Sequence, residues 1–340
     1  MHQEQESVLR LKEELSAPQP IVVTTHQGPD GDAMGSSLAL YLFLKKQGHD
    51  VSVITPNDYP EFLHWMPANA DVVNYMRQKP LAEELVKKAA YIFHLDYNHI
   101  KRSADMTRLL SRSKAVRVLI DHHLHPELSA KYTFSEIEVS STCELLYRVM
   151  KQWDESLIDR GIVTCIYTGI MTDTGSFCYR SASAQTFAVA AELMGYNIDR
   201  TGIYDKVYDN YSECRMRLMG YCLDKKMEVF PQYCAAFISL NLEEQQRYNF
   251  AVGDSEGFVN LPLSIKGIRF TAFFLEKEDK IKISFRSKGD FSVNDFARKH
   301  FGGGGHLNAS GGDTKSSLEE SICKFRELLP LYEKELNSDE

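Results

Sequence analysis

The chain has 340 residues, of which 43% are hydrophobic and 25% are charged, and its formal net charge is -8. That length is enough for about two domains of ordinary size, each with a core of its own. An acidic chain is poorly suited to binding long nucleic acid, because such binding needs many Lys and Arg side chains along the phosphates. An anionic substrate must therefore be met locally, by metal ions or by a small basic pocket.

The seven cysteines are scattered along the chain and include no C-x-x-C pair. Such a set is typical of buried, reduced thiols rather than of a disulfide framework or a zinc site. The first twenty residues are polar and carry four glutamates, which argues against a signal peptide, and no apolar run reaches the length of a membrane span. We therefore expect a cytoplasmic protein with no membrane partner.

In chain order, the first half alternates short apolar runs with helical patterns. The runs predict strands at 21–25, 51–55, 90–95 and 116–120, and helices at 36–46, around 81–88, at 143–152 and at 157–171. This alternation predicts an α/β fold with a mostly parallel sheet and helices on both faces. In such sheets, ligands bind outside the carboxyl ends of the strands.

The second half begins with a helical pattern from 184 to 226, which we interpret as a connector between two domains. Strand-like runs, a helix, a glycine run and an amphipathic helix then indicate a smaller α+β domain. The strands are expected at 233–240, 268–275 and 280–286, and the helices near 294–299 and from 316 to about 336. The expected organisation is a first domain over 1–190, a helical connector over 191–226 and a second domain over 227–340.

Polar motifs follow the expected strands of the first domain. Each aspartate in them is explained equally well as a turn residue or a helix cap, the common role of Asp before a helix. These structural roles explain the whole set less well, because carboxylates at neighbouring strand ends repel one another unless a cation lies among them. No Lys or Arg occurs inside these motifs, which are His26–Asp32, Leu95–Asn98, Asp121–His123 and Thr172–Gly175.

Two divalent cations would nearly neutralise four of these carboxylates. A mixed set of imidazole and carboxylate ligands suits Mn, Fe, Co or Zn, whereas magnesium is typically bound by oxygen ligands alone. Two cations that share a carboxylate are a standard device for in-line attack at phosphorus. We therefore expect two divalent cations, with Mn²⁺ favoured and Mg²⁺, Co²⁺ or Fe²⁺ as alternatives. The candidate ligands are His26, Asp30, Asp32, Asp96, His122 and Asp173.

In their order and spacing, these motifs resemble those of the DHH phosphoesterases: His-x-x-x-Asp-x-Asp-Ala-x-Gly-Ser, a strand-end Asp, Asp-His-His and Thr-Asp-Thr-Gly. The resemblance implies that His123 faces the substrate phosphate. It also implies that Asp121 orients a histidine through a hydrogen bond and does not itself bind a cation. The segment from Ser140 also looks like the helix start that follows Asp-His-His in this family. The implied metal ligands are His26 and Asp30 at one cation, Asp32, His122 and Asp173 at the other, and Asp96 as the bridge.

The glycine run at 302–305 is followed by His306 and Asn308, with structured segments expected on both sides. Most glycine runs are flexible connections. Consecutive glycines also let backbone N–H groups approach a phosphate or a base closely, because no Cβ intervenes. Upstream, Arg286 offers a cation at the end of a strand, which can hold a phosphate through two hydrogen bonds or simply be solvated.

This half resembles the C-terminal domain that accompanies many DHH enzymes, with a mild departure where Ser310 replaces the commoner alanine. The resemblance implies that the second domain closes over the metal site and binds the nucleotide. The whole arrangement is similar to that of the NrnA-type enzymes, which degrade nanoRNAs and dephosphorylate 3′-phosphoadenosine 5′-phosphate. The implied substrate-binding residues are Arg286, Ser287, Gly303, Gly304, Gly305 and His306.

The sequence therefore predicts a metal-dependent phosphoesterase that cleaves short oligonucleotides to 5′-mononucleotides, with adenosine bisphosphate and cyclic dinucleotides as further substrates. Two alternatives stay open: an inorganic polyphosphate or pyrophosphate hydrolase, and a nucleotide- or RNA-binding module without turnover. The glycine run counts against the first and the intact ligand set against the second. A processive exonuclease is disfavoured, because no additional oligonucleotide-binding domain is recognisable, and a homodimer stays open.

Overall fold

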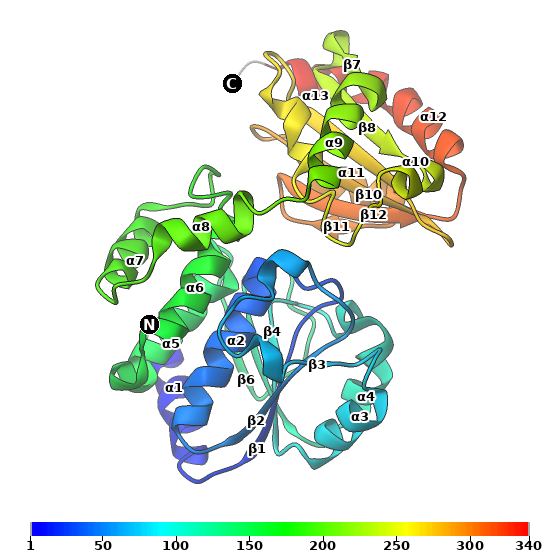
Figure 1. Cartoon of the computed structure of the whole chain (residues 1–340). Helices are drawn as coiled ribbons and strands as arrows, with labels where there is room; N and C mark the ends of the chain where they lie inside the picture. Colours follow the sequence, from blue (N-terminus) through cyan, green and yellow to red (C-terminus); the bar gives the residue numbers. More distant parts are fainter. Residues whose placement is uncertain (1, 339–340) are drawn as a thin grey trace. The chain divides into compact units, whose positions relative to one another are not determined.

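The computed structural model describes residues 2–338, and the chain divides into two compact units between residues 210 and 211 (Figure 1). Each unit is built on a six-stranded sheet of its own. The predicted fold class, an α/β unit followed by a smaller α+β unit, is confirmed. Among the described residues, no helix is long and apolar enough to cross a membrane.

The sheet of the first unit is entirely parallel, with the strand order β3-β2-β1-β4-β5-β6. The chain extends this sheet on one side of β1 and then, from β4 onward, on the other side. The carboxyl ends of β1 and β4 therefore form the topological switch point at which ligands of such sheets bind. The strands are β1 Pro20–Thr24, β2 Asp50–Thr55, β3 Val73–Asn74, β4 Tyr91–Leu95, β5 Val116–Asp121 and β6 Tyr132–Ser135.

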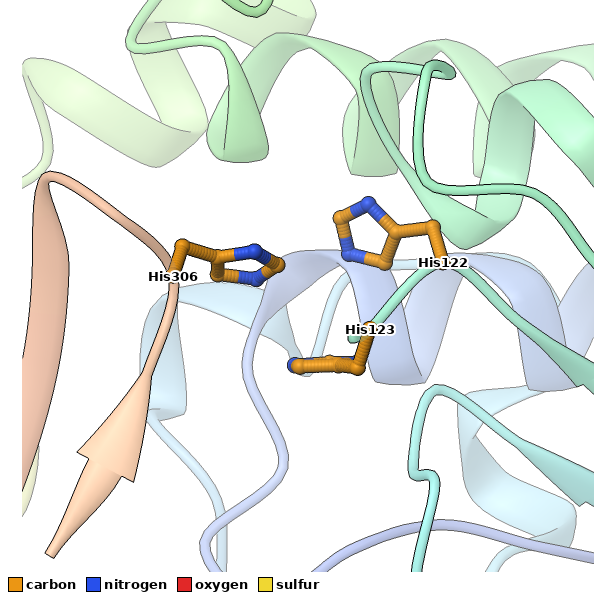
Figure 2. Close-up of side chains that lie close together, drawn as sticks. All are labelled: His122, His123 and His306. Carbon is orange, nitrogen blue, oxygen red and sulfur yellow. The ribbon is translucent and has the colours of Figure 1, made fainter. Parts of the chain in front are cut away.

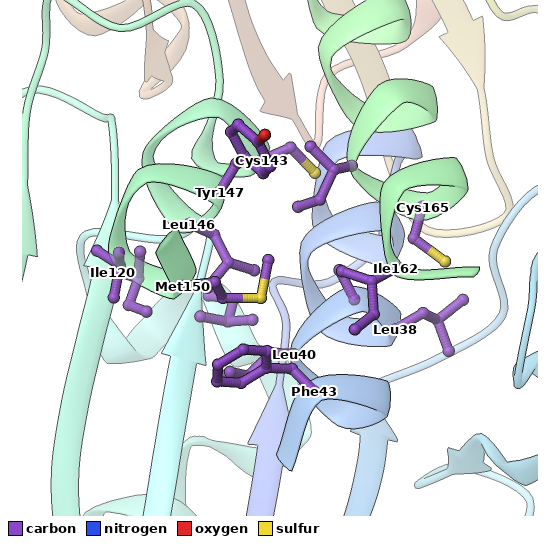
Figure 3. Packing of buried hydrophobic residues seen from close by; sticks show 14 of the residues in the cluster. Leu38, Leu40, Phe43, Ile120, Cys143, Leu146, Tyr147, Met150, Ile162 and Cys165 are labelled. Carbon is purple, nitrogen blue, oxygen red and sulfur yellow. The ribbon is translucent and has the colours of Figure 1, made fainter. Parts of the chain in front are cut away.

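Helices cover both faces of this sheet, because successive side chains of each strand point to opposite sides. Ile21 and Val23 pack in one core with the first set of helices, and Val22 packs in another core with the second set. Figure 3 shows the first core, with Phe43, Met150 and Ile162 contributed by three helices. The first set is α1 His2–Glu14, α2 Gly31–Lys46, α5 Thr142–Asp154 and α6 Arg160–Asp173; the second is α3 Lys79–Lys88 and α4 Thr107–Arg112.

Two further helices complete the first unit. Helix α7 (Ala184–Met194) begins with a capping box, in which Ser183 and Thr186 each bind the backbone of the other. Helix α8 (Arg200–Tyr208) follows and leads to the boundary with the second unit.

The second unit has a mixed sheet of order β11-β12-β10-β9-β8-β7, in which only β8 and β9 pair in parallel. Its core is aromatic: the ring of Phe270 lies within 5.0–6.1 Å of four other phenylalanine rings. The strands are β7 Met227–Phe230, β8 Ala235–Leu240, β9 Phe270–Glu276, β10 Ile281–Ser287, β11 Gly304–Gly305 and β12 Ala309–Thr314. The helices are α9 Glu213–Tyr221, α10 Leu242–Arg247, α11 Val293–Phe301, α12 Leu318–Leu328 and α13 Glu333–Asn337.

Candidate metal centre

The carboxyl edge of the first sheet collects polar side chains from five segments. His26 follows β1, Asp32 lies in the first turn of α2, and Asp96 follows β4. His122 follows β5 directly. Asp173 is the last residue of α6, and the glycine-rich turn begins after it.

The first group of candidate ligands is His26, Asp30 and Asp96, whose ligand atoms lie within 4.8 Å of one another. Nε2 of His26 lies 3.4 Å from Oδ2 of Asp96 and 3.9 Å from Oδ2 of Asp30. Nδ1 of His26 lies 2.9 Å from the carbonyl oxygen of Gln27, which makes Nδ1 the donor of the ring. Nε2 of His26 is buried and has no hydrogen-bond partner in the described part of the chain, and the lone pair that it carries when neutral points at the two carboxylates.

The second group of candidate ligands surrounds His122. Its Nε2 lies 3.4 Å from Asp173, 3.9 Å from Asp32 and 3.6 Å from Oδ1 of Asp96. Asp96 thus faces the first group with Oδ2 and the second group with Oδ1. It does so from a left-handed backbone conformation, with φ of 64°. This shared carboxylate is the geometry expected of a residue that bridges two cations.

Asp32 is held by the start of helix α5. Its two oxygens accept hydrogen bonds from the backbone N–H groups of Thr142 and Cys143, at 2.7 and 2.8 Å. The hydroxyl of Thr142 also donates to Asp96, at 3.0 Å. A carboxylate has about four lone-pair sites, so Asp32 keeps sites for a cation after accepting both bonds.

Close packing of α6 brings Asp173 to this group. A Cβ on Gly169 would meet the sulfur of Cys143 at 2.2 Å and a carboxylate oxygen of Asp32 at 3.0 Å. Only glycine therefore lets α6 lie this close to α2 and α5. The sequence shows the Thr-Asp-Thr-Gly motif, but the requirement at Gly169 depends on contacts between helices and could not be predicted.

Asp121 and His123 form a pair beside the two groups. Nδ1 of His123 donates to Oδ1 of Asp121 at 2.7 Å, and the Asp121 side chain is fully buried. Figure 2 shows His122 and His123 leaving the same loop, with their rings inclined by 71°. Burial lowers the pKa of His123 to about 4, although the bond to Asp121 and the charge of Asp96 oppose this shift. His123 is therefore neutral near pH 7, with its Nδ1 proton directed at Asp121.

Arg102 is a cation that the motif analysis missed. Its carbonyl oxygen accepts a hydrogen bond of 2.7 Å from the backbone N–H of Gln27, which places it beside the loop of His26. Burial is the main cause of the low pKa of His123, and the positive charge of Arg102 lowers it further. Within residues 2–338, no hydrogen bond or ion pair uses its guanidinium group. Arg102 lies outside every motif, six residues after Asp96, so no spacing rule pointed to it.

In the second unit, the glycine run at 302–305, called the glycine segment below, lies against β12. A Cβ on Gly303 would meet the carbonyl oxygen of Gly311 at 1.8 Å, and Gly305 has a φ of 151° that other residues rarely adopt. The N–H of Gly303 donates to Ala297, and the N–H of Gly305 donates to the side chain of Asn294. These glycines therefore serve a tight connection, as well as any role toward a ligand.

Arg286, Ser287 and His306 lie at the same end of this unit's sheet. Ser287 is buried; its hydroxyl donates to the carbonyl of Phe291 and accepts from Asn308. The guanidinium of Arg286 donates only to the adjacent carbonyl of Phe285, and it has no carboxylate partner in the described part of the chain. His306 follows β11, and its backbone N–H donates to Ala309.

Known proteins share both units. Residues 20–170 match the N-terminal domain of the DHH family, and residues 231–334 match the DHHA1 domain. Over 87% of its length, the chain is 30% identical to the bifunctional oligoribonuclease and PAP phosphatase NrnA of Thermus thermophilus, of which it covers 84%. The chain belongs to the DHH family. It is therefore a phosphoesterase, a class of hydrolase.

Two other DHH relatives span nearly the whole chain. The Bacillus subtilis protein named bifunctional oligoribonuclease and PAP phosphatase NrnA is 26% identical, with 92% of this chain and 97% of that protein covered. A crystal structure of an exopolyphosphatase-related protein from Bacteroides fragilis is 44% identical, covers 98% of both chains and has a TM-score of 0.93.

The electrostatics of the DHH unit favour bound cations. Burial raises the pKa of Asp32 well above its usual range, and the charges of Asp96, Asp173 and Asp30 raise it further. Burial would also raise the pKa of Asp96, but the close contact with His26 and the charges of the nearby histidines lower it. These carboxylates therefore repel one another when no positive charge lies among them. The residues fit a pair of divalent cations, which would supply that charge.

This crowding predicts an unusual stability effect at the DHH site. We expect Asp173→Asn to raise the melting temperature of the protein in chelator, because it removes one charge that opposes ionisation of Asp32. With Mn²⁺ present, the wild type gains stability by mass action and overtakes the variant. Thermal melts with and without chelator measure both effects, with the exposed Asp205→Asn as a control. A variant that melts below the wild type in chelator would contradict the crowding.

Proposed function

We propose that this DHH-family chain hydrolyses short oligonucleotides to 5′-mononucleotides and removes phosphate from 3′-phosphoadenosine 5′-phosphate. The names of the Thermus and Bacillus relatives support this substrate class. The observation that carries the proposal is the position of Asp96, whose two oxygens each face one group of candidate ligands. Such a divided carboxylate suits two cations at one phosphate.

In this proposal, one cation is held by His26 and Asp30, and the other by Asp32, His122 and Asp173, with Asp96 shared. The mixture of imidazole and carboxylate ligands favours Mn²⁺, with Mg²⁺, Co²⁺ or Fe²⁺ as alternatives. When bound, two such cations supply Lewis-acid activation of water and of the phosphoryl oxygens.

The remaining residues act on the substrate directly or on one another. Asp121 fixes the tautomer of His123, so that the opposite ring nitrogen carries a lone pair and must take up a proton before it can donate to the phosphoryl or leaving oxygen. We also assign Arg102 to the substrate, because a guanidinium without a partner among residues 2–338 can hold a phosphate oxygen pair. These groups stabilise the charge that develops at phosphorus.

The DHHA1 domain provides, in this proposal, the contacts that select a nucleotide. Among the residues that the structure describes, none supplies a carboxylate partner to Arg286, which leaves it available for a second phosphate. His306 offers an imidazole, and a base or a phosphate can approach this segment closely because Gly303, Gly304 and Gly305 carry no Cβ. Ser287 contributes indirectly, through its bond to Asn308 at the end of the glycine segment.

An inorganic polyphosphate hydrolase is the second candidate. The name of the Bacteroides relative favours it, since that protein is described as exopolyphosphatase-related. The same cation site would serve both reactions. A polyphosphate chain, however, has no base or ribose for the glycine segment and Arg286 to select.

The two candidates separate in one assay. Purified full-length chain with Mn²⁺ is given pApA, a five-nucleotide RNA, 3′-phosphoadenosine 5′-phosphate, cyclic di-AMP, pyrophosphate and a short polyphosphate. We expect the first three to be hydrolysed with the highest kcat/KM and chelator to stop every reaction. Faster hydrolysis of polyphosphate would support the second candidate. Binding of pApA without any turnover would indicate a binding module instead.

A further inference from the structure

Glu144 is a buried carboxylate that none of the roles above uses. Its side chain is 1% exposed and lies in the first turn of α5, the helix whose start holds Asp32. Three donors converge on its Oε2: the backbone N–H and the hydroxyl of Ser140, at 3.2 and 2.6 Å, and the hydroxyl of Thr186, at 2.8 Å. Its other oxygen is buried without a hydrogen bond in the described structure.

The start of α5 is an unusual helix cap. The hydroxyl of the N-cap residue Ser141 accepts from the backbone N–H of Glu144, at 3.1 Å. Glu144 then reaches back past the cap to Ser140 rather than to the cap itself. The two N–H groups in between, of Thr142 and Cys143, are left for Asp32. Glu144 and Ser141 therefore set the direction in which this helix presents two donors to the metal site.

Thr186 extends this arrangement to helix α7. It is fully buried, and its hydroxyl also accepts from the N–H of Ser183 in the capping box of α7. Helix α7 leads through α8 to residue 210, where the first unit ends. One hydrogen bond thus joins the segment that precedes the second unit to the helix start that orients Asp32 and Asp96.

We propose that Glu144 is a positioning residue for the metal site and that Thr186 couples this residue to helix α7. The inference rests on the proposed cation site. Loss of Glu144 would let the Ser140–Ser141 cap move, and the donors of α5 would then no longer align with Asp32. Outer partners of this kind typically contribute about 10–100-fold to metal affinity or activity.

The test compares Mn²⁺ affinity of full-length variants, measured by titration of metal-free protein and followed by electron paramagnetic resonance. We expect Glu144→Met to weaken Mn²⁺ binding about 10–100-fold and Thr186→Val about fivefold, the value of roughly one hydrogen bond. Thr186→Ser keeps the hydroxyl and should bind like the wild type. Glu144→Gln keeps one acceptor oxygen and should fall between wild type and Glu144→Met.

Glu192→Met is the matched control. Glu192 also ties α7 to α5, through Tyr147 in the middle of α5 and Lys151 in its last turn. This variant should lose some stability and keep its Mn²⁺ affinity. An equal loss of affinity in Glu192→Met would show that general helix packing, rather than Glu144, is responsible.

Other outcomes are also decisive. If folded Glu144→Met binds Mn²⁺ as tightly as the wild type, the inference about Glu144 is overturned and the proposed function is not. If Glu144→Met does not fold, wild-type Mn²⁺ affinity in both Thr186→Val and Glu144→Gln has the same meaning. Failure of the wild type to bind Mn²⁺ at all would instead overturn the proposed function on which it rests.

Discussion

Asp96→Asn should reduce turnover of pApA by more than about a hundredfold, the upper end of losses seen when an outer partner of a metal ligand is removed. The amide keeps the shape of the side chain but removes the charge that faces both ligand groups. Asparagine, like aspartate, is one of the non-glycine residues that tolerate the φ of 64° at this position. Steady-state kinetics with saturating Mn²⁺ measure the loss.

Asp205→Asn on helix α8 is the control, because it makes the same chemical change at an exposed site. The melting temperature of metal-free Asp96→Asn shows whether the variant is folded. Should a folded variant keep more than about a tenth of the wild-type rate, the two-cation assignment would be wrong.

Arg286→Ala and His306→Ala should each lower kcat/KM for a dinucleotide by about ten- to a thousandfold, corresponding to one or a few charge-assisted hydrogen bonds. Contacts remote from the reacting phosphate can raise the rate as well as the affinity, because they position that phosphate. Bis(p-nitrophenyl) phosphate has no second phosphate, ribose or base for those residues to bind. Its hydrolysis should therefore fall far less.

Arg247→Ala, an exposed cation in the same unit, controls for a general change of charge. Equal losses on both substrates, with the metal content unchanged, would mean that Arg286 and His306 serve the chemistry or the fold. No loss on either substrate would leave the glycine segment as a structural connection.

One rule of topology explains why the candidate ligands named from the sequence lie close together. Parallel strands end at a common edge, so His26, Asp96 and His122 had to come together once their strands were recognised. The alternation of strands and helices likewise predicted the layered first unit.

Contacts between distant segments escaped the same analysis. Neither Arg102 nor Glu144 was among the candidate site residues named from the sequence. Arg102 lies in η3 (Ile100–Met106) and Glu144 lies in α5, and the neighbours of both depend on how these elements and α7 pack. Strands β11 and β12 were missed because they are rich in glycine, which has no strand preference of its own. Pairing with the backbone of β10 makes β12 a strand.

The packing at Gly169 also has a consequence for the thiols of this protein. Cys143 is fully buried beside Gly169, and burial raises the pKa of its thiol well above the usual range. An alkylating reagent reacts with the thiolate, so Cys143 is protected both by exclusion of the reagent and by its protonation. Its alkylation rate therefore reports how often the packing of α6 against α5 opens, and comparison with the rate of global unfolding separates local opening from unfolding of the whole unit.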